Sequence, residues 1–512
     1  MTDIVLTTLN ARYAHASLGL RYLRANLGDL HQHSRIAEFV IGQKTEEIVE
    51  KLLAQQPRIV GIGVYIWNVE ESTRLVAQLK TLRPDLIIVL GGPEVSFEVE
   101  EQRICALADY VITGWGDVSF ASLAAAILRG EAPTGKIIKG VQAPLPALLM
   151  PYAEYTEEDV RQRHLYVEAS RGCPFKCEFC LSALDKTAWP FPLDSFMAEL
   201  EGLYARGARQ FKFVDRTFNL KIDASLAILD FFLAKLDANP EDPPFIHFEL
   251  VPDHLPERLK AAIVRFPAGT LQFEIGIQTF DPEVQARVSR RQKNDVARDN
   301  LLWLREHSQA HLHVDLIAGL PGESVDQFAA GFDQLVALAP HEIQFGILKR
   351  LRGAPIARHT AAHALRFNPD PPYNILATDM IDFATMQRLS RFSRYWDILA
   401  NSGRYTRSLP RLLGNSPFAR FLAFSDWLYA QTGQTHALAR ERLVHLLHDY
   451  LCFQADVDAV AAAVDLAADY HAGGGRSRLR FEAADAPLPL PRSKREDGAT
   501  PKRQAQHLAG RA

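Results

Sequence analysis

The stretch Tyr166-Val-Glu-Ala-Ser-Arg-Gly-Cys-Pro-Phe-Lys-Cys-Glu-Phe-Cys180 places three of the five cysteines of the chain within eight residues. Cys173, Cys177 and Cys180 have the spacing C-x3-C-x2-C and follow a short run that is typical of a strand. Iron–sulfur clusters are held by thiolates, and three thiolates leave one iron of a four-iron cluster open to a substrate. A structural zinc site needs four closed ligands, and no fourth Cys or His follows at short spacing. We therefore interpret the triplet as the ligands of a [4Fe-4S] cluster with an open iron.

Six strand-like segments separated by helical patterns begin with this stretch. They are residues 166–170, 211–214, 245–250, 271–277, 313–317 and 342–348. Apolar runs between helices predict a parallel sheet that is buried on both faces. Six strand–helix units predict an open, partial (β/α)6 barrel over residues 165–366 rather than the closed eight-unit barrel. In such barrels the chemistry lies at the carboxyl ends of the strands.

The triplet resembles the signature of the radical S-adenosylmethionine (SAM) superfamily, because an aromatic residue, Phe179, precedes its last cysteine. The resemblance implies an enzyme that cleaves SAM reductively at the cluster to a 5′-deoxyadenosyl radical. It also implies that Phe179 packs near the adenine and that polar groups at the ends of the second and third barrel strands face the cofactor. Asp215 and Glu249 are the candidates at those two positions.

Two later segments resemble further motifs of the same superfamily. Glu274-Ile-Gly-Ile-Gln-Thr-Phe280, followed by Arg290, resembles the pattern of radical coproporphyrinogen oxidase. This implies that Gln278 and Arg290 reach the ribose and the carboxylate of SAM, and the planar fork of an arginine suits a carboxylate. Asp315-Leu-Ile-Ala-Gly-Leu-Pro-Gly-Glu323 resembles the fifth-strand motif, which implies that Asp315 and the backbone at Gly319 hold the adenine and ribose.

The first 140 residues alternate strand and helix patterns of their own. The expected strands are residues 4–9, 36–40, 59–65, 86–90 and 110–113, and the expected helices are 18–26, 46–54, 68–82 and 118–129. Asn68, with Glu71 three residues later, matches a capping box at the start of the third helix. This alternation predicts a doubly wound, Rossmann-like domain, whose ligand lies beyond the carboxyl ends of its strands. Residues 141–164 are rich in proline at their start and are interpreted as a linker.

A doubly wound domain ahead of a radical SAM barrel resembles the cobalamin-binding class of the superfamily. The resemblance implies that cobalamin is bound by loops at the carboxyl edge of the first sheet. The candidate contacts are Asn10, Arg12, Tyr13, His15, Ser17, Tyr65, Trp67, Gly91, Gly92, Glu94, Gly114 and Gly116.

Two alternatives for this domain are disfavoured by its motifs. A plain dinucleotide site would open its first helix with G-x-G-x-x-G, which is missing. A histidine ligand on cobalt would belong to D-x-H-x-x-G, but Tyr13 stands two residues before His15. His15 is therefore interpreted as a hydrogen-bonding loop residue. His311 and His313, which alternate at a strand start, are likewise interpreted as ordinary strand positions rather than metal ligands.

Residues 367–472 have helical patterns at 375–389, 392–401, 418–431, 436–454 and 457–469. Over residues 1–470 the chain resembles a subgroup whose C-terminal helical domain has no assigned function. We expect that domain to cap the mouth of the barrel. Residues 473–512, which begin with three glycines and are rich in Pro, Lys and Arg, are expected to be disordered.

The bulk properties exclude several classes of protein. A net charge of −4 provides no general basic field for nucleic acid or an anionic membrane. No charged and apolar leader precedes the first strand, and no apolar run approaches the ~20 residues that span a bilayer. These features predict a cytoplasmic protein.

The first functional hypothesis is a cobalamin-dependent radical SAM methyltransferase that acts on an unactivated carbon. An electron donor such as flavodoxin or ferredoxin is implied, and the substrate is not identified by the residues. A radical cyclase, oxidase or rearrangement enzyme that uses cobalamin without net methylation is the second hypothesis. A non-catalytic sensor that binds the cluster or cobalamin is the third.

Overall fold

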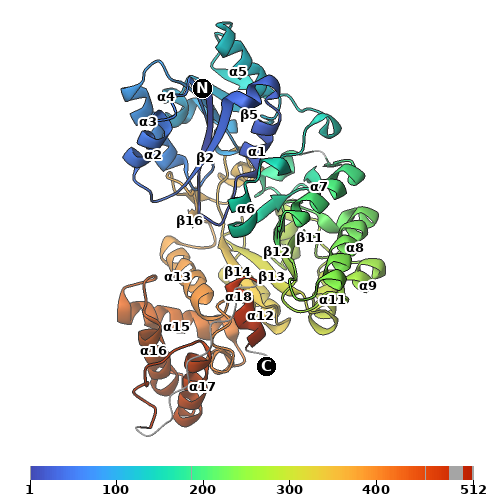
Figure 1. Cartoon of the computed structure of the whole chain (residues 1–512). Coiled ribbons are helices and arrows are strands. Elements are labelled where there is room, and N and C mark those ends of the chain that lie inside the picture. The colour runs from blue at the N-terminus through green and yellow to red at the C-terminus, as the bar shows by residue number, and fades with distance from the viewer. Residues whose placement is uncertain (1, 186, 456, 484–499, 510–512) are drawn as a thin grey trace. The chain divides into compact units, whose positions relative to one another are not determined.

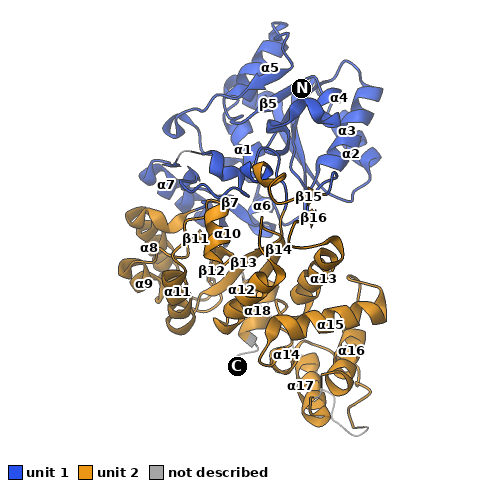
Figure 2. Ribbon diagram, turned by 180° about the vertical axis from the view of Figure 1, so that it is seen from behind, with its two compact units in different colours: residues 1–216, 349–357, 368–374 blue, residues 217–348, 358–367, 375–512 orange. Residues whose placement is uncertain are grey.

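The computed structural model describes residues 2–185, 187–455, 457–483 and 500–509 (Figure 1). The chain divides into two compact units (Figure 2). The first unit consists of residues 1–216, 349–357 and 368–374, and the second consists of residues 217–348, 358–367 and 375–512.

The first unit contains the predicted doubly wound sheet. Six parallel strands lie in the order β2-β1-β3-β4-β5-β6. They are β1 (Ile4–Asn10), β2 (Ser34–Val40), β3 (Ile59–Gly63), β4 (Ile87–Gly91), β5 (Tyr110–Thr113) and β6 (Ile137–Lys139). The strand order reverses between β1 and β3, and the carboxyl ends of strands at such a reversal are where doubly wound sheets bind ligands.

Helices cover both faces of this sheet (Figure 1). Apolar residues of α2 (Thr45–Leu53), α3 (Val69–Leu82) and α4 (Arg103–Leu107) pack on one face. Apolar residues of α1 (Leu18–Ala25) and α5 (Ser119–Arg129) pack on the other. All seven residues of β1 are buried, as expected for a central strand that is covered on both sides.

The predicted capping box at Asn68 is wrong. Helix α3 begins at Val69 as expected, but the Asn68 side chain makes no capping hydrogen bond. Its Oδ1 accepts a hydrogen bond of 2.8 Å from the Tyr65 N–H, and its Nδ2 donates to Leu9 O at 3.0 Å. Asn68 therefore joins the loop after β3 to the end of β1, because these buried backbone groups need partners.

The segment that the sequence analysis interprets as a linker folds against the first sheet. Helix α6 (Glu157–Gln162) begins with a complete capping box formed by Thr156 and Asp159. Arg21 of α1 is almost fully buried and pairs with Glu38 at 2.9 Å and with Asp159 at 2.7 Å. A buried guanidinium is stable only when its charge is matched, so these pairs fix α6 to α1 and β2. Hydrophobic periodicity could not predict this packing of α6, since Arg21 and Asp159 are far apart in the sequence.

Two short segments that follow β14 (Glu342–Ile347) in the sequence, residues 349–357 and 368–374, belong to the first unit. Arg350 pairs with Glu98 at 2.6 Å, and Arg352 pairs with Glu98 at 2.6 Å and with Glu94 at 3.0 Å. The Tyr373 hydroxyl donates to Glu94 at 2.7 Å. These contacts place residues 349–357 and 368–374 with the N-terminal sheet.

The first unit also contains the first two strands of the predicted barrel. Strands β7 (Leu165–Val167) and β10 (Gln210–Phe213) are parallel neighbours, and α7 (Leu193–Ala205) precedes β10. Strands β8 (Ser170–Gly172) and β9 (Ala188–Pro190) form an antiparallel pair between them. The cysteine triplet lies on the loop between β8 and β9.

The second unit contains the other four barrel strands, which are parallel in the order β14-β13-β12-β11. They are β11 (Phe245–Leu250), β12 (Leu271–Gln278), β13 (His311–Ala318) and β14 (Glu342–Ile347). The accompanying helices are α8 (Ile222–Ala238), α9 (Glu257–Ile263), α10 (Pro282–Arg287), α11 (Asn294–His307) and α12 (Val325–Ala337). The chain thus has the six parallel strands of the predicted partial barrel.

Helix α13 (Phe383–Leu399) packs against β14 and α12, and the other C-terminal helices follow it. Phe392 of α13 contacts Phe332 of α12 and Phe345 of β14, with ring centroids 5.1 and 5.0 Å apart. The remaining helices are α14 (Leu409–Leu413), α15 (Pro417–Thr432), α16 (Arg440–Phe453) and α17 (Ala459–Ala472). The helix expected at 375–389 begins only at Phe383, as the start of α13, and Ile375–Ala377 form the short strand β16 instead. The Ile375 N–H donates to Leu348 O just after β14.

The expected disordered tail of residues 473–512 is described only in part. Residues 484–499 and 510–512 lie outside the described residues. Residues 502–509 form α18 (Lys502–Ala509), which differs from the expectation. Arg503 of this helix pairs with Glu342 and Asp397, each at 2.9 Å, so partners distant in sequence support a helix that its composition does not predict. Among the described residues, none of the helices has the length and apolar character to cross a membrane.

Candidate active site

The cysteine loop begins at a position that requires glycine. Gly172 has φ +96°, and a Cβ atom there would lie 2.5 Å from Thr187 O. The loop then closes locally, since the Cys180 N–H donates to Cys177 O at 3.0 Å and Lys176 Nζ donates to Ala183 O at 3.0 Å. Only a residue without a side chain lets the two strands approach this closely before the triplet.

The three cysteines are half-buried, lie on this one loop and form no disulfide. Burial raises the pKa of the Cys173 thiol, and the neighbouring Cys180 and Cys177 raise it further. The charges of these thiolates would repel one another, and a bound cation would remove that repulsion. Three adjacent thiols on one loop are a suitable ligand set for iron. Phe179 lies on the same loop and is half-buried.

Asp215 lies two residues after β10 and is buried. Its Oδ2 accepts a hydrogen bond of 3.0 Å from the Ala169 N–H, and its Oδ1 accepts one of 2.6 Å from the Ser170 hydroxyl. Burial raises the pKa of Asp215 to about 7, although these hydrogen bonds oppose the shift. The structure therefore places this carboxyl against the strand that leads into the cysteine loop.

The remaining SAM candidates lie at strand ends of the second unit. Gln278 ends β12 with φ +69°, and its buried Oε1 has no hydrogen-bond partner among the described residues. Arg290 Nε donates to Ile277 O at 3.0 Å, so its guanidinium lies against the same strand end. Asp315 is on the neighbouring strand, opposite Gly276. A buried amide oxygen without a partner is costly, and a ligand hydroxyl beside Gln278 would satisfy it.

Gly319 and Glu249 complete this set. Gly319 follows β13 with φ +89°, and a Cβ atom there would lie 2.6 Å from Ile375 Cγ2. The start of the C-terminal region therefore lies at the carboxyl end of β13, as a domain that reaches the barrel mouth requires. Glu249 is on β11 opposite Glu274 of β12. Asp315 also lies beside His313, with a shortest distance of 3.4 Å between their charged atoms.

A cavity of about 610 Å³ lies at the carboxyl ends of β3, β4 and β5 in the first unit. Five of the twelve candidate cobalamin contacts line it, namely Tyr65, Gly91, Gly92, Gly114 and Gly116. Gly92 has φ +111°, and a Cβ atom there would lie 2.4 Å from Val64 O. The lining is mainly apolar and includes Leu23, Phe97, Trp115 and Phe120. A large concave site with glycines at its edge suits a flat, bulky ligand.

The other seven candidates lie outside this lining and have other partners or exposed positions. Asn10 Nδ2 and the Ser17 N–H both donate to Glu38 Oε1, at 2.9 and 2.5 Å. Trp67 stacks on Tyr65 with ring centroids 4.5 Å apart, and Glu94 binds Arg352 as described above. Arg12 and Tyr13 are exposed.

His15 makes a hydrogen bond, as the sequence analysis expects of it. A distance of 2.7 Å joins its Nδ1 to the Tyr166 hydroxyl. Burial, and next the neighbouring His164, lower the pKa of His15 to about 4, so its ring is neutral near pH 7. Its ring packs beside those of His164 and Tyr166.

Sequence reasoning missed Arg171, which stands immediately before the cysteine loop. Its guanidinium carbon lies 4.7 Å from the ring centre of Tyr22 and 4.8 Å from that of Trp115. Its nitrogens pair with Glu168 at 2.6 Å and with Asp117 at 3.0 Å. Arg171 thereby connects the cysteine loop to the loop after β5, and both line the same cavity. The position of this arginine next to the triplet was the signal that could have identified it.

Three family models match successive parts of the chain. The B12 binding domain matches residues 4–124, the radical SAM superfamily matches residues 167–335, and a protein of unknown function, DUF4080, matches residues 361–474. The three matched ranges follow the order of the domains expected from the sequence.

Curated relatives and solved structures agree with these models. An uncharacterized methyltransferase of Pyrococcus horikoshii is 28% identical over 239 residues, which are 41% of this chain and 52% of the relative. The 2-(S-pantetheinyl)-carbapenam-3-carboxylate methyltransferase of Streptantibioticus cattleyicolor is 24% identical over 359 residues, 62% of this chain and 51% of the relative. The chain thus spans about half the length of these curated relatives.

Two solved structures share the fold. The cobalamin-dependent S-adenosylmethionine radical enzyme OxsB, solved with aqua-cobalamin and SAM, gives a TM-score of 0.63 at 13% identity and covers 92% of this chain and 84% of that one. The radical SAM methyltransferase TsrM from Kitasatospora setae gives 0.57 at 17% identity and covers 73% and 80%. The chain thus has a B12-binding domain followed by a radical SAM domain, and it is homologous to cobalamin-dependent radical SAM methyltransferases.

Proposed function

We propose that this chain is a cobalamin-dependent radical SAM methyltransferase that methylates an unactivated carbon. The observation that carries the proposal is the set of residues that line the large cavity at the carboxyl ends of β3, β4 and β5. It includes Glu168 and Arg171, which precede the cysteine triplet, and Leu181, Ser182, Leu184 and Asp185, which follow it. The candidate corrin site and the candidate cluster site are thus adjacent within one compact unit. A methyl carrier and a radical source must both reach one substrate, so adjacency is what this reaction needs.

Cys173, Cys177 and Cys180 would hold the cluster, which when bound supplies the electron for reductive cleavage of SAM. Gln278, with its unpaired Oε1, and Arg290 would orient the SAM ribose and carboxylate at the end of β12. The Phe179 ring, half-buried on the cysteine loop, would exclude water from the adenine. Asp215 would act on the loop itself, through its hydrogen bonds to Ala169 and Ser170.

The cavity at β3, β4 and β5 would hold cobalamin, which when bound carries the methyl group. The backbone of Gly92 and Gly114 would allow close approach, and the apolar side chains of Phe97 and Trp115 would keep water away. His15 would not coordinate cobalt, since it is hydrogen-bonded to Tyr166. We also propose that a flavodoxin or ferredoxin delivers the electron in the cytoplasm.

The test is anaerobic turnover of the reconstituted enzyme with cobalamin, a reductant and SAM that carries a deuterated methyl group. Metabolite extract from cells that express the protein serves as the source of substrate. A methyltransferase yields 5′-deoxyadenosine, S-adenosylhomocysteine and a product heavier than its substrate by the labelled methyl group. A product without that label would overturn methyl transfer in favour of a cyclase or oxidase. Cys177→Ala is the control, because it should lose all three products while retaining cobalamin.

A further inference from the structure

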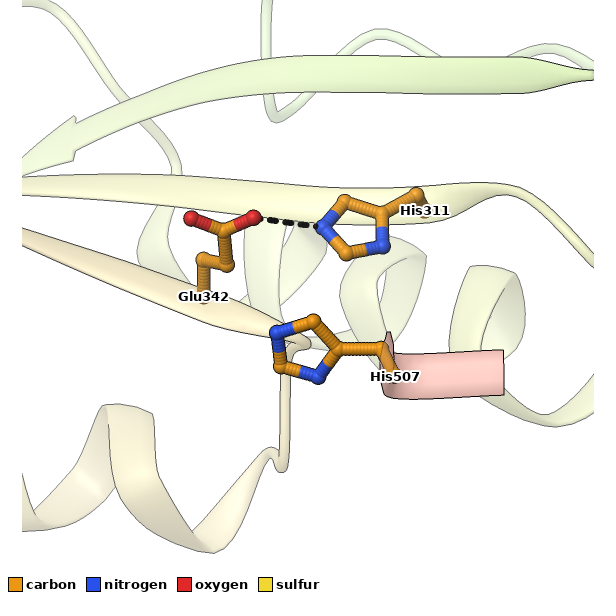
Figure 3. Close-up of side chains that lie close together, drawn as sticks. All are labelled: His311, Glu342 and His507. Atoms are coloured by element: carbon orange, nitrogen blue, oxygen red, sulfur yellow. Dashed lines mark hydrogen bonds and ion pairs between the residues drawn. The ribbon is translucent and has the colours of Figure 1, made fainter. Parts of the chain in front are cut away.

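Three side chains that could bind a metal ion gather at the amino ends of two barrel strands (Figure 3). None of them is among the candidate cluster, SAM or cobalamin contacts. His311 is the first residue of β13, Glu342 is the first residue of β14, and His507 lies on α18. Each offers one ligand atom, and these atoms lie within 4.8 Å of one another. We propose that His311, Glu342 and His507 form a zinc site that fixes the C-terminal helix α18 to the floor of the barrel.

The chemistry of the three ligands suits zinc. Two imidazoles and one carboxylate, with water in the fourth position, are an established zinc ligand set. Nitrogen and oxygen ligands of a tetrahedral zinc lie about 3.4 Å apart, given bonds of about 2.0–2.1 Å. His311 Nε2 and Glu342 Oε1 are 2.9 Å apart and share a hydrogen bond, so a zinc ion would replace the shared proton and separate the two atoms slightly. A small movement of His507 on its short helix would complete the site.

Glu342 and His507 are in the forms that bind a metal, whereas zinc binding through His311 Nε2 requires the proton shared with Glu342 to leave that nitrogen. Burial opposes the charge on Glu342, but the hydrogen bond from His311 and the charges of His313, His311 and Arg503 lower its pKa to about 2. Burial, and next His311, lower the pKa of His507 to about 4. His507 Nε2 donates to Asn401 O at 3.1 Å, so coordination through this nitrogen requires the proton to move to Nδ1.

The surrounding residues hold the ligands in place. Arg503 pairs with Glu342 Oε2 at 2.9 Å, on the oxygen that does not face His311. The His341 ring stacks on His311 with centroids 4.5 Å apart. A polar cavity of about 280 Å³ is lined by Arg503, Asn401 and other polar residues, and these two contact Glu342 and His507 respectively. Outer contacts of this kind orient metal ligands.

The position of the site indicates a structural role. Residues at the amino ends of barrel strands contribute to stability, whereas catalysis uses the carboxyl ends. Helix α18 has eight residues, which is too short to be stable without tertiary contacts. His507 reaches the other two ligands only when α18 is docked, so zinc binding and docking of α18 are coupled.

The experiment uses untagged holoenzyme with its cluster loaded, incubated with zinc, desalted and analysed for metals by mass spectrometry. The wild type should retain about one zinc per chain, and His507→Ala should lose it while keeping its iron. His507→Cys should retain zinc, because a thiolate also binds it. His307→Ala, which removes an exposed histidine, is the matched control and should behave as the wild type. Equal zinc in the wild type and in His507→Ala would overturn the proposal.

Hydrogen exchange of a peptide that covers residues 502–509 tests the coupling. Zinc should slow its exchange in the wild type and in His307→Ala but not in His507→Ala. Zinc that binds without slowing this exchange would refute the role in fixing α18. His507 variants are chosen because a change on the terminal helix leaves the buried strands intact, which His311→Ala does not.

Discussion

At Gly92 the backbone itself shapes the floor of the large cavity. Its φ of +111° and the 2.4 Å that would separate a Cβ atom from Val64 O leave no room for any side chain. Gly130 is a natural comparison, because it has φ +78° at the end of α5 but open space around it. A comparison of substitutions at these two glycines therefore separates the free-energy cost of backbone strain from that of a collision with the neighbouring backbone.

Gly92→Ala should therefore destabilise the protein more than Gly130→Ala. A left-handed backbone costs an L residue roughly 1–2 kcal/mol, and only Gly92→Ala adds a collision to this cost. The collision should also displace the loop after β4 and weaken cobalamin binding. Urea unfolding and titration with hydroxocobalamin measure the two effects. Equal losses of stability in the two variants would contradict the assigned collision.

Asp215 gives the stability a defined dependence on pH. Its folded pKa of about 7 lies above the value of about 3.9 in an unfolded chain, so the folded state binds more protons between these limits. The contribution of this group to stability is therefore present at low pH and is lost as the pH rises through about 7.

Asp215→Asn should remove this part of the pH dependence. Between about pH 5 and 8 the urea midpoint of the variant should fall less with rising pH than that of the wild type. The measurement is a series of urea denaturations across this range. Asp29→Asn, at an exposed position, serves as the comparison and should follow the wild type. A variant whose profile is parallel to the wild type would show that Asp215 is not the group that titrates.

Arg171 connects two loops of different elements. It is the middle residue of β8, and its partners Trp115 and Asp117 belong to the loop after β5. The guanidinium combines stacking on two rings with two ion pairs, a combination that a lysine cannot reproduce. The cavity wall at this point depends on one side chain.

Arg171→Ala should weaken cobalamin binding by about tenfold or more, which corresponds to about 1.4 kcal/mol. The loss follows because the loop after β5 is released and because Glu168 and Asp117 lose their shared cation. Arg171→Lys should recover only part of the affinity. Titrations followed by the visible spectrum of cobalamin give the affinities, with Arg161→Ala on exposed α6 as the control. An unchanged affinity in Arg171→Ala would remove the role given to this residue.

The elements differ in how far the sequence predicts them. The strands from β1 to β5 and from β11 to β14 follow from apolar runs, because at least every second residue of most of them is buried. The edge strand β6 and the helix α18 are missed, because three and eight residues carry too little periodicity. The side chain of Glu94 illustrates the same limit in the candidate site. It lies at the predicted loop, yet its partner Arg352 is 258 positions away and no local pattern indicates it.

At the scale of the whole molecule, every residue that lines the large cavity belongs to the first unit. A ligand stabilises the part of a protein that must be folded to bind it, by about 2.7 kcal/mol at a hundredfold excess over its dissociation constant. The stabilisation by bound cobalamin should therefore be confined to the first unit.

Cobalamin should slow hydrogen exchange in β3, β4, β5 and α1, and should leave α12, α13 and α15 of the second unit unchanged. Mass spectrometry of peptides from the apo and cobalamin-loaded protein measures this difference. The C-terminal helices act as the internal control, since their aromatic contacts lie with Phe332 and Phe345. Equal protection of both units would contradict the assignment of the site to the first.

The ion pairs from Arg350 and Arg352 to Glu98 also determine when the first unit can be completed during synthesis. Glu98 and Arg350 are 252 positions apart, so the N-terminal sheet leaves the ribosome long before its last contacts exist. Domains generally fold in order as they emerge, and a contact over so long a loop forms late. The edge beside Glu94 and Glu98 therefore lacks these partners until residues 349–374 have been translated.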